Sequence, residues 1–393
     1  MFSYFFKVIT IHVLALIVNK LFSINTLKKF MVFIFYASVS SHAIANKLSS
    51  DISEITESTS IDSTSSQLKF TQLSTLHGLS NSNVFGITQD HQGFIWFATE
   101  DGLNRFDGNN FVTYRHNINN THSIADNVIR KIFIDSENTL WVGTENGLSR
   151  YNVELDNFDN FKHATNDDSS LKDNVIWDIF QNKNNISNSK QEKSPLWIST
   201  SEGLHTLSPT SNVNNIKFNR INIRDHNDKI REIKTIFQDK QQNYWLGTFD
   251  NGIHLLSKSL NYIGSLTQAN KFNLTIKANA LFDMKIIDNQ YWLATDNGLY
   301  IVDDRYQLVS HLTEKPKEND KSQVLLSNKI RNIEQFDENH VWLATHNGLN
   351  TINLLNKEIK SYQNDNNSSA LSENWLMDIY RDNNENMWLA SYG

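Results

Sequence analysis

The sequence predicts an all-β fold, a seven-bladed β-propeller of four-stranded antiparallel blades. A repeat of about 45 residues predicts it: a Trp, an aliphatic residue or Phe, a small residue, Thr or Ser, polar turn residues, Gly, and then Leu or Ile. Each repeat contains about four short β-rich segments separated by turn residues, and four strands in a repeat of this length are typical of a propeller blade. The repeat tryptophans are Trp96, Trp141, Trp197, Trp245, Trp292, Trp342 and Trp388.

The repeated residues are interpreted as structural. Each repeat Trp is expected to pack between neighbouring blades, where a large flat side chain fills the gap between sheets. Aspartates that precede the tryptophans, such as Asp90 and Asp135, are expected to bond backbone N–H groups of a tight turn. The repeat glycines are expected in hairpins that need a positive φ. They are Gly102, Gly147, Gly203, Gly252, Gly298 and Gly348.

The two ends of the chain are expected to meet in the last blade, because a ring closed by strands from both ends leaves no edge unpaired. Residues 68–73 resemble 216–221, which we interpret as an outermost strand, so they are predicted to supply the outermost strand of the seventh blade. The first two strands of that blade are expected at 375–381 and 387–391. Only the third strand would then be missing, and we therefore expect the chain to be a truncated reading frame or a fragment.

Residues 1–45 are predicted to be a signal peptide or an N-terminal anchor. A Lys-Lys pair beginning at Lys28 precedes an apolar run, and an Ala-x-Ala pattern ends at Ala45, as in a cleavable leader. Residues 46–67 are rich in Ser, Thr and acidic residues and are predicted to be a flexible linker. The β-propeller should then occupy residues 68–393 in a periplasmic or other extracytoplasmic compartment.

Composition limits the function classes. The net charge is −7 and the Lys and Arg residues are scattered, which argues against a nucleic-acid partner, since that partner needs a basic stripe. The chain has no cysteine, so thiol nucleophiles and Cys-based zinc sites are excluded. The thirteen histidines lack metal-ligand spacing, and no catalytic triad or Gly-rich phosphate loop stands in a supporting context. We therefore predict no catalytic residue, no metal site and no cofactor.

Functional residues are expected to vary between blades on one rim of the propeller, where loops surround the axial mouth. One repeat position is assigned to Arg130, Arg231 and Arg331, with Trp177 and Phe282 in the same position of other blades. Arginine can bind acidic groups through paired hydrogen bonds, and aromatic rings can stack on sugars. These five residues are therefore predicted to bind a small polar ligand, such as an anionic or stacked sugar.

Two structural alternatives stay open at this rim. The arginines could merely pair with acidic neighbours such as Glu232 or Asp178. A polar row at the start of the strands could contact the ligand or could cap turns. This row is Asn127, Asn174, Asn279, Asn328 and Asn374.

The strings Gly78–Val84, Asp90–Trp96 and Thr99–Gly108 resemble the two-component regulator propeller repeats, and the resemblance covers residues 68–393. It implies the periplasmic sensor of a one-piece signalling protein, with commonly an oligosaccharide as ligand. It also implies downstream parts: often a second propeller, a small β-sandwich, a membrane helix, and a histidine kinase or diguanylate cyclase. This sequence ends before those parts, so kinase or cyclase activity would belong to them. Membrane contact is expected only through the N-terminal segment or those parts.

The sequence thus predicts an extracytoplasmic ligand-sensing propeller of a bacterial two-component or related receptor, and not an enzyme. Binding of an oligosaccharide or other small polar ligand is expected to alter contacts with a second propeller or protomer. One alternative is a secreted propeller lyase or hydrolase, which needs His clustered with Glu or Arg at one mouth. Another is a protein-interaction scaffold, which needs a flat apolar rim.

Overall fold

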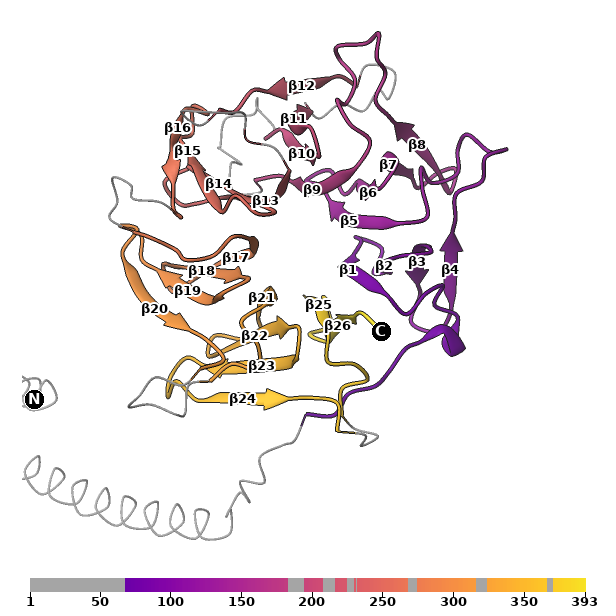
Figure 1. The fold of residues 1–393 in the computed structure, drawn as a ribbon. Coiled ribbons are helices and arrows are strands. Elements are labelled where there is room, and N and C mark those ends of the chain that lie inside the picture. The colour runs from indigo at the N-terminus through magenta and orange to yellow at the C-terminus, as the bar shows by residue number, and fades with distance from the viewer. Residues whose placement is uncertain are drawn as a thin grey trace, which may run out of the picture. The chain divides into compact units, whose positions relative to one another are not determined.

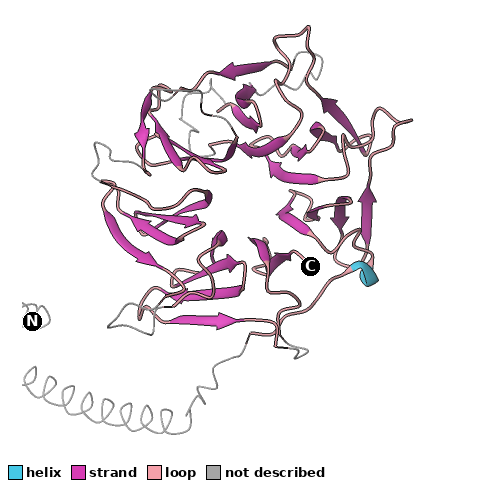
Figure 2. Ribbon diagram, viewed as in Figure 1, coloured by secondary structure: helices cyan, strands magenta, loops and turns pink. Residues whose placement is uncertain are grey.

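The computed structural model describes residues 68–182, 194–207, 216–224, 230, 232–267, 274–315, 324–365 and 370–393. The segments predicted as leader (1–45) and linker (46–67) lie outside the described residues. Lys69–Gly393 is one compact unit, made of antiparallel sheets arranged around a central axis (Figure 1). Apart from one short 3-10 turn, η1 (Thr75–His77), the regular elements are strands (Figure 2). No helix in these ranges is long and apolar enough to cross a membrane.

Each of the first three blades contains four strands that pair in sequence order, from the innermost to the outermost. Blade 1 is β1 (Val84–Gln89), β2 (Ile95–Thr99), β3 (Gly102–Phe106) and β4 (Phe111–Tyr114). Blade 2 is β5 (Ile129–Ile134), β6 (Leu140–Thr144), β7 (Gly147–Asn152) and β8 (Asn157–Phe161). Blade 3 is β9 (Ile176–Phe180), β10 (Leu196–Thr200), β11 (Gly203–Leu207) and β12 (Phe218–Ile221).

The following three blades repeat this order, and a two-stranded sheet comes after them. Blade 4 is β13 (Ile233–Gln238), β14 (Tyr244–Thr248), β15 (Ile253–Leu256) and β16 (Tyr262–Ser265). Blade 5 is β17 (Leu281–Ile287), β18 (Gln290–Thr295), β19 (Gly298–Val302) and β20 (Leu308–Leu312). Blade 6 is β21 (Ile330–Gln335), β22 (His340–Thr345), β23 (Gly348–Asn353) and β24 (Ile359–Tyr362). The two-stranded sheet is β25 (Leu376–Arg381) and β26 (Met387–Ser391).

The four-stranded antiparallel blade is confirmed, but the prediction of seven blades is wrong. Six four-stranded blades are present among the described residues, and the seventh place in the ring holds only β25 and β26. Residues 68–73 form no strand, contrary to the prediction that they complete this sheet. An outermost strand needs a third strand to pair with, and only Tyr392 and Gly393 follow β26 in this chain.

The β25–β26 hairpin nevertheless closes the ring. β25 contacts β21 of blade 6 on one side and β1 of blade 1 on the other. The backbone N–H of Ile87 donates to Oδ2 of Asp378 at 2.9 Å, and Trp388 packs against the buried cluster of blade 1. The early and late parts of the propeller therefore meet, as predicted, but through blade 1 and the hairpin.

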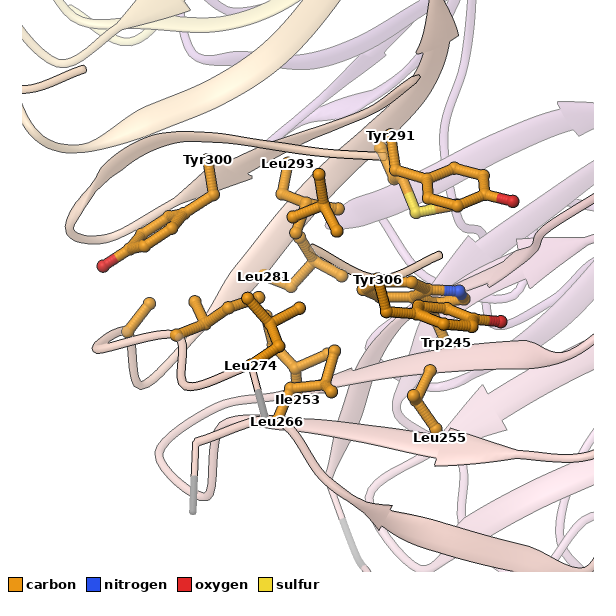
Figure 3. Packing of buried hydrophobic residues seen from close by; sticks show 14 residues of the cluster. Trp245, Ile253, Leu255, Leu266, Leu274, Leu281, Tyr291, Leu293, Tyr300 and Tyr306 are labelled. Atoms are coloured by element: carbon orange, nitrogen blue, oxygen red, sulfur yellow. The ribbon is translucent and has the colours of Figure 1, made fainter. Parts of the chain in front are cut away.

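The repeat tryptophans pack between sheets, as predicted. Trp245 of blade 4 is fully buried against blade 5, with the rings of Tyr291 and Tyr306 5.7 Å from its own (Figure 3). The corresponding tryptophans of blades 1, 2, 3 and 5 lie in buried clusters shared with the next blade. Trp342 is buried as well and stacks on Phe336 of its own blade. These clusters make the inter-blade gaps the core of the protein.

Local hydrogen bonds explain why each repeat folds into the same hairpins. Oδ1 of Asp90 accepts two backbone N–H groups of the first turn, and its Oδ2 accepts the indole N–H of Trp96 at 2.7 Å. Asp135 does the same for its turn and for Trp141. The predicted turn role of these aspartates is therefore confirmed, and each also holds a core tryptophan in place. All six repeat glycines have a positive φ, as predicted.

The repeat threonines close the second hairpin of each blade, and replacing one is expected to have a modest cost. Oγ1 of Thr144 donates to the carbonyl of Gly147 at 2.7 Å and accepts the N–H of Asn146. Thr144→Val keeps the shape but removes both bonds, so it should lower the free energy of unfolding by about 1 kcal/mol in urea denaturation. Thr121→Val, in an exposed loop, is the control and should change it by less than about 0.5 kcal/mol.

Candidate ligand site at the axial mouth

The innermost strands of all seven sheets line a central cavity of about 950 Å³. Each of these strands contains a β-bulge near its start, where the pairing with the second strand skips one residue. In β5, for example, Ile129 and Lys131 are paired and Arg130 between them is not. A bulge bends its strand and re-aims the unpaired side chain. We call the seven unpaired residues the bulge ring: Phe85, Arg130, Trp177, Lys234, Phe282, Arg331 and Met377.

The structure brings together four of the five residues predicted to bind ligand. Arg130, Trp177, Phe282 and Arg331 all belong to the bulge ring and all line the cavity. Arg231 lies outside the described residues. The repeat position assigned to Arg231 is occupied by Lys234, because Ile233 pairs with Thr248 as Ile129 pairs with Thr144 in blade 2. The assignment of Arg231 to this position was therefore wrong.

Cations and aromatic rings alternate along the bulge ring from blade 1 to blade 6. The guanidinium carbon of Arg130 lies 5.8 Å from the ring centroid of Phe85 and 5.2 Å from that of Trp177. Lys234 Nζ lies directly over the indole ring of the same Trp177, on its other side in the order of the blades. Arg331 lies 4.3 Å above the Phe282 ring. Attraction between a cation and the face of an aromatic ring holds these side chains in place around the mouth.

The three cations of the bulge ring differ in their partners. Arg130 forms an ion pair with Glu145 in the turn after β6. Among the described residues no carboxylate forms an ion pair with Lys234 or Arg331, and Nε of Arg331 has no hydrogen-bond partner. Burial lowers the pKa of Lys234 to about 8, against the opposing effect of Glu232 and with a smaller contribution from Arg130, and burial lowers that of Arg331 to about 10. Both side chains are thus mainly charged at neutral pH.

A further aromatic ring, that of Phe249, lines the same cavity, and His346 lies near the charge of Arg331. Phe249 is 62% exposed and lies 5.0 Å from Nζ of Lys234. Trp375 is 41% exposed, and its ring lies 4.7 Å from that of His346 and 4.8 Å from that of Tyr392, tilted against both. Burial, followed by the positive charge of Arg331, lowers the pKa of His346 to about 4, so its imidazole is neutral at pH 7. Exposed rings beside charged groups suit a ligand that is polar at its edges and has a face to stack.

The residues directly after the bulge-ring residues form a second ring. Its aspartates are Asp178 of β9, Asp283 of β17 and Asp378 of β25. Each accepts a backbone N–H from the innermost strand of the next blade, at 2.8 to 2.9 Å. Asp178 also pairs with Lys131 at 2.8 Å. Burial raises the pKa of Asp378 to about 7 and raises that of Asp283 as well. Sequence reasoning named Asp178 only as a possible partner of the arginines and missed Asp283 and Asp378, although each of the three directly follows a bulge-ring residue in the chain.

The polar row at the start of the strands caps turns in the described residues. Oδ1 of Asn127 accepts the N–H of His116, and its backbone carbonyl accepts the N–H of Gly102 in the preceding blade. Asn174 makes the equivalent two bonds. The row therefore ties neighbouring blades together. Within the described ranges no group of three or more His, Asp or Glu side chains is placed to hold a metal ion.

Comparison with known proteins identifies the repeats. Residues 78–101 and 123–146 match the family described as Two component regulator propeller. These two stretches match two-component regulator propeller repeats. A further match, over 66 residues at 41% identity, is to Histidine kinase P4 of Formosa agariphila, and it covers 17% of this chain and 5% of that protein. The residues that match the family include β1 and β2 of blade 1 and β5 and β6 of blade 2, where Arg130 lies.

Two solved structures are similar in fold to the regulator propeller. Both are extracellular domains of putative hybrid two component systems from B. thetaiotaomicron. One has a TM-score of 0.66 at 24% identity and covers 83% of this chain and 41% of its own length. The other has a TM-score of 0.60 at 18% identity, with coverages of 83% and 39%. The chain thus spans less than half the length of these relatives, and at this identity the likeness concerns the fold.

Proposed function

We propose that this propeller is the ligand-sensing, extracytoplasmic part of a bacterial two-component or related signalling protein. The observation that carries the proposal is the bulge ring: seven strands place their unpaired side chains around one cavity, and a ligand there contacts several blades at once. The extracellular domains with the same fold and the family match support a sensing role. In this proposal the propeller binds and does not catalyse.

The proposal includes the route of the signal. The N-terminal segment exports the domain, and output belongs to a kinase or cyclase part of the longer protein. A ligand that binds two arrangements of the propeller with different affinity shifts the balance between them. The contact that changes is with a second propeller or a second protomer. Because the ligands implied by the resemblance are oligosaccharides, a small oligosaccharide is the proposed ligand class.

Trp177 provides the test of the site. Thermal-shift screening of the full chain against a glycan panel is expected to find a stabilising oligosaccharide. Trp177→Ala should then weaken its binding about tenfold in calorimetry, since truncating an aromatic anchor of a binding site costs more than 1 kcal/mol. Val309→Ala, on the exposed outer strand β20, is the control and should bind normally. A bound glycan whose affinity is the same in Trp177→Ala would place the site elsewhere.

The lyase or hydrolase alternative predicts turnover in the same assay. His346 is the histidine beside Arg331, and its Nε2 has no hydrogen-bond partner among the described residues. A catalytic base normally needs such a partner and a pKa near the working pH. Product formation from a panel glycan, abolished in His346→Gln, would favour the enzyme.

A further inference from the structure

Two lysines inside the cavity form ion pairs, whereas two cations at its mouth form none among the described residues. Within the cavity, Lys131 pairs with Asp178 at 2.8 Å and Lys285 pairs with Glu334 at 2.7 Å. At the mouth, neither Lys234 nor Arg331 forms an ion pair among the described residues, and only the more distant charges of Glu232 and Asp378 raise their pKa values. Half-burying an unpaired cation is unfavourable, and an anion that binds there removes the cost.

The surroundings of Lys234 and Arg331 also favour a bound anion. Lys234 and Arg130 lie against the same ring, that of Trp177, so two like charges converge on one point. Their mutual repulsion is relieved by a bound negative group. Arg331 offers its guanidinium from the face of Phe282, two blades further round the ring. Two separate cationic positions thus face one mouth.

The second ring sets how deep an anion can go. Asp178 and Asp378 line the cavity behind the bulge ring. A negative group that passed Lys234 or Arg331 would approach Asp378, which forms no ion pair among the described residues, and its ionised form would repel that group. The arrangement of cations outside and acidic groups inside favours an anion held at the mouth.

We infer that the site takes a ligand with at least two anionic groups, one held by Lys234 and Arg130 over Trp177 and the other by Arg331. This inference rests on the proposed function and narrows its ligand class from polar to multiply acidic. The groups in question are carboxylates or sulfates, which guanidinium and ammonium bind through charge-assisted hydrogen bonds. The spacing of the cations over two blades selects for charges at the two ends of a short molecule.

The test compares three probes on the full chain by isothermal titration calorimetry: trigalacturonate, citrate and the neutral trisaccharide maltotriose. Trigalacturonate or citrate should bind at least about tenfold more tightly than maltotriose at low salt, and this preference should shrink at about 0.5 M NaCl. Arg331→Gln and Lys234→Gln should each weaken binding of that acidic probe about tenfold. Lys360→Gln, which removes a positive charge from the outer strand β24, is the matched control and should not.

The outcomes separate this inference from the proposed function. Should maltotriose bind as tightly as both acidic probes, with Trp177→Ala weakened but Arg331→Gln and Lys234→Gln unchanged, the inference is overturned and the sensing site stands. If no probe binds, or if Trp177→Ala, Arg331→Gln and Lys234→Gln all leave the affinity unchanged, the inference and the proposed sensing site are both overturned. Arg331→Lys keeps the positive charge and should retain the salt dependence of binding. If the salt dependence is lost in Arg331→Lys, then Arg331→Gln weakened binding for structural reasons, and the role of charge is overturned.

Discussion

Trp245→Ala is expected to lower the free energy of unfolding by about 3–5 kcal/mol, the usual cost of truncating a large buried aromatic side chain. Trp245 is fully buried between blades 4 and 5, so no solvent fills the gap that its removal leaves. Its indole N–H also donates to Asp239 at 2.9 Å, and the substitution leaves that buried carboxyl with one partner fewer.

Urea denaturation followed by tryptophan fluorescence gives the measurement. Phe249→Ala is the matched control, because it removes an aromatic ring from the same blade at a site that is 62% exposed. It should change stability by less than about 0.5 kcal/mol. A cost below about 1 kcal/mol for Trp245→Ala would contradict the view that inter-blade packing of the tryptophans is the main core of the fold.

The stability of the propeller is expected to fall as the pH rises from about 4 to about 7, because of Asp378. Burial raises the pKa of this carboxyl to about 7 in the folded protein. The folded state therefore holds a proton that the unfolded state has already released above about pH 4. The stabilisation is complete below the unfolded pKa and is lost as the pH passes through 7. Since the group is half-buried and faces the cavity, water screens it and the effect is about 2 kcal/mol.

Asp378→Asn should remove this fall and raise stability at pH 8. The amide oxygen can still accept the N–H of Ile87 that joins the hairpin to blade 1, now without a buried charge. Asp178→Asn is the matched comparison: it sits in the same ring position but pairs with Lys131, so its loss should destabilise the protein. Melting temperatures measured from pH 4 to pH 8 decide the matter. An unchanged pH profile in Asp378→Asn would show that another group is responsible.

The blade architecture could be predicted because its determinants are local. Asp90 binds its own turn and the indole of Trp96 only six residues away, and Gly102 adopts a positive φ three residues after β2 ends. Such contacts repeat with the sequence and are visible in it. Ring closure was harder to predict, because it depends on contacts between distant parts of the chain: β25 contacts β1, and residues 68–73 form no strand.

The candidate site was predicted in part, and blade 4 shows why the rest was missed. The bulge residue stands between apolar residues three apart, and in blade 4 this spacing occurs twice, around Arg231 and around Lys234. The distance to the repeat tryptophan distinguishes them. Arg130, Arg331 and Lys234 each lie 11 residues before theirs, whereas Arg231 lies 14 before Trp245. Which residue is left unpaired is a matter of strand register, and apolar spacing alone does not reveal it.

Seven is an odd number, and two kinds of side chain cannot alternate perfectly around an odd ring. The mismatch falls where the last sheet meets the first: Met377 and Phe85 are adjacent there, with no positive charge between them. The mouth therefore has one uncharged sector and an opposite charged arc. A bound molecule would meet positive charge on one side of the mouth and none on the other. It would therefore have a preferred orientation and could not rotate freely about the axis. A mouth of this kind would distinguish the two ends of a bound molecule as well as its charge.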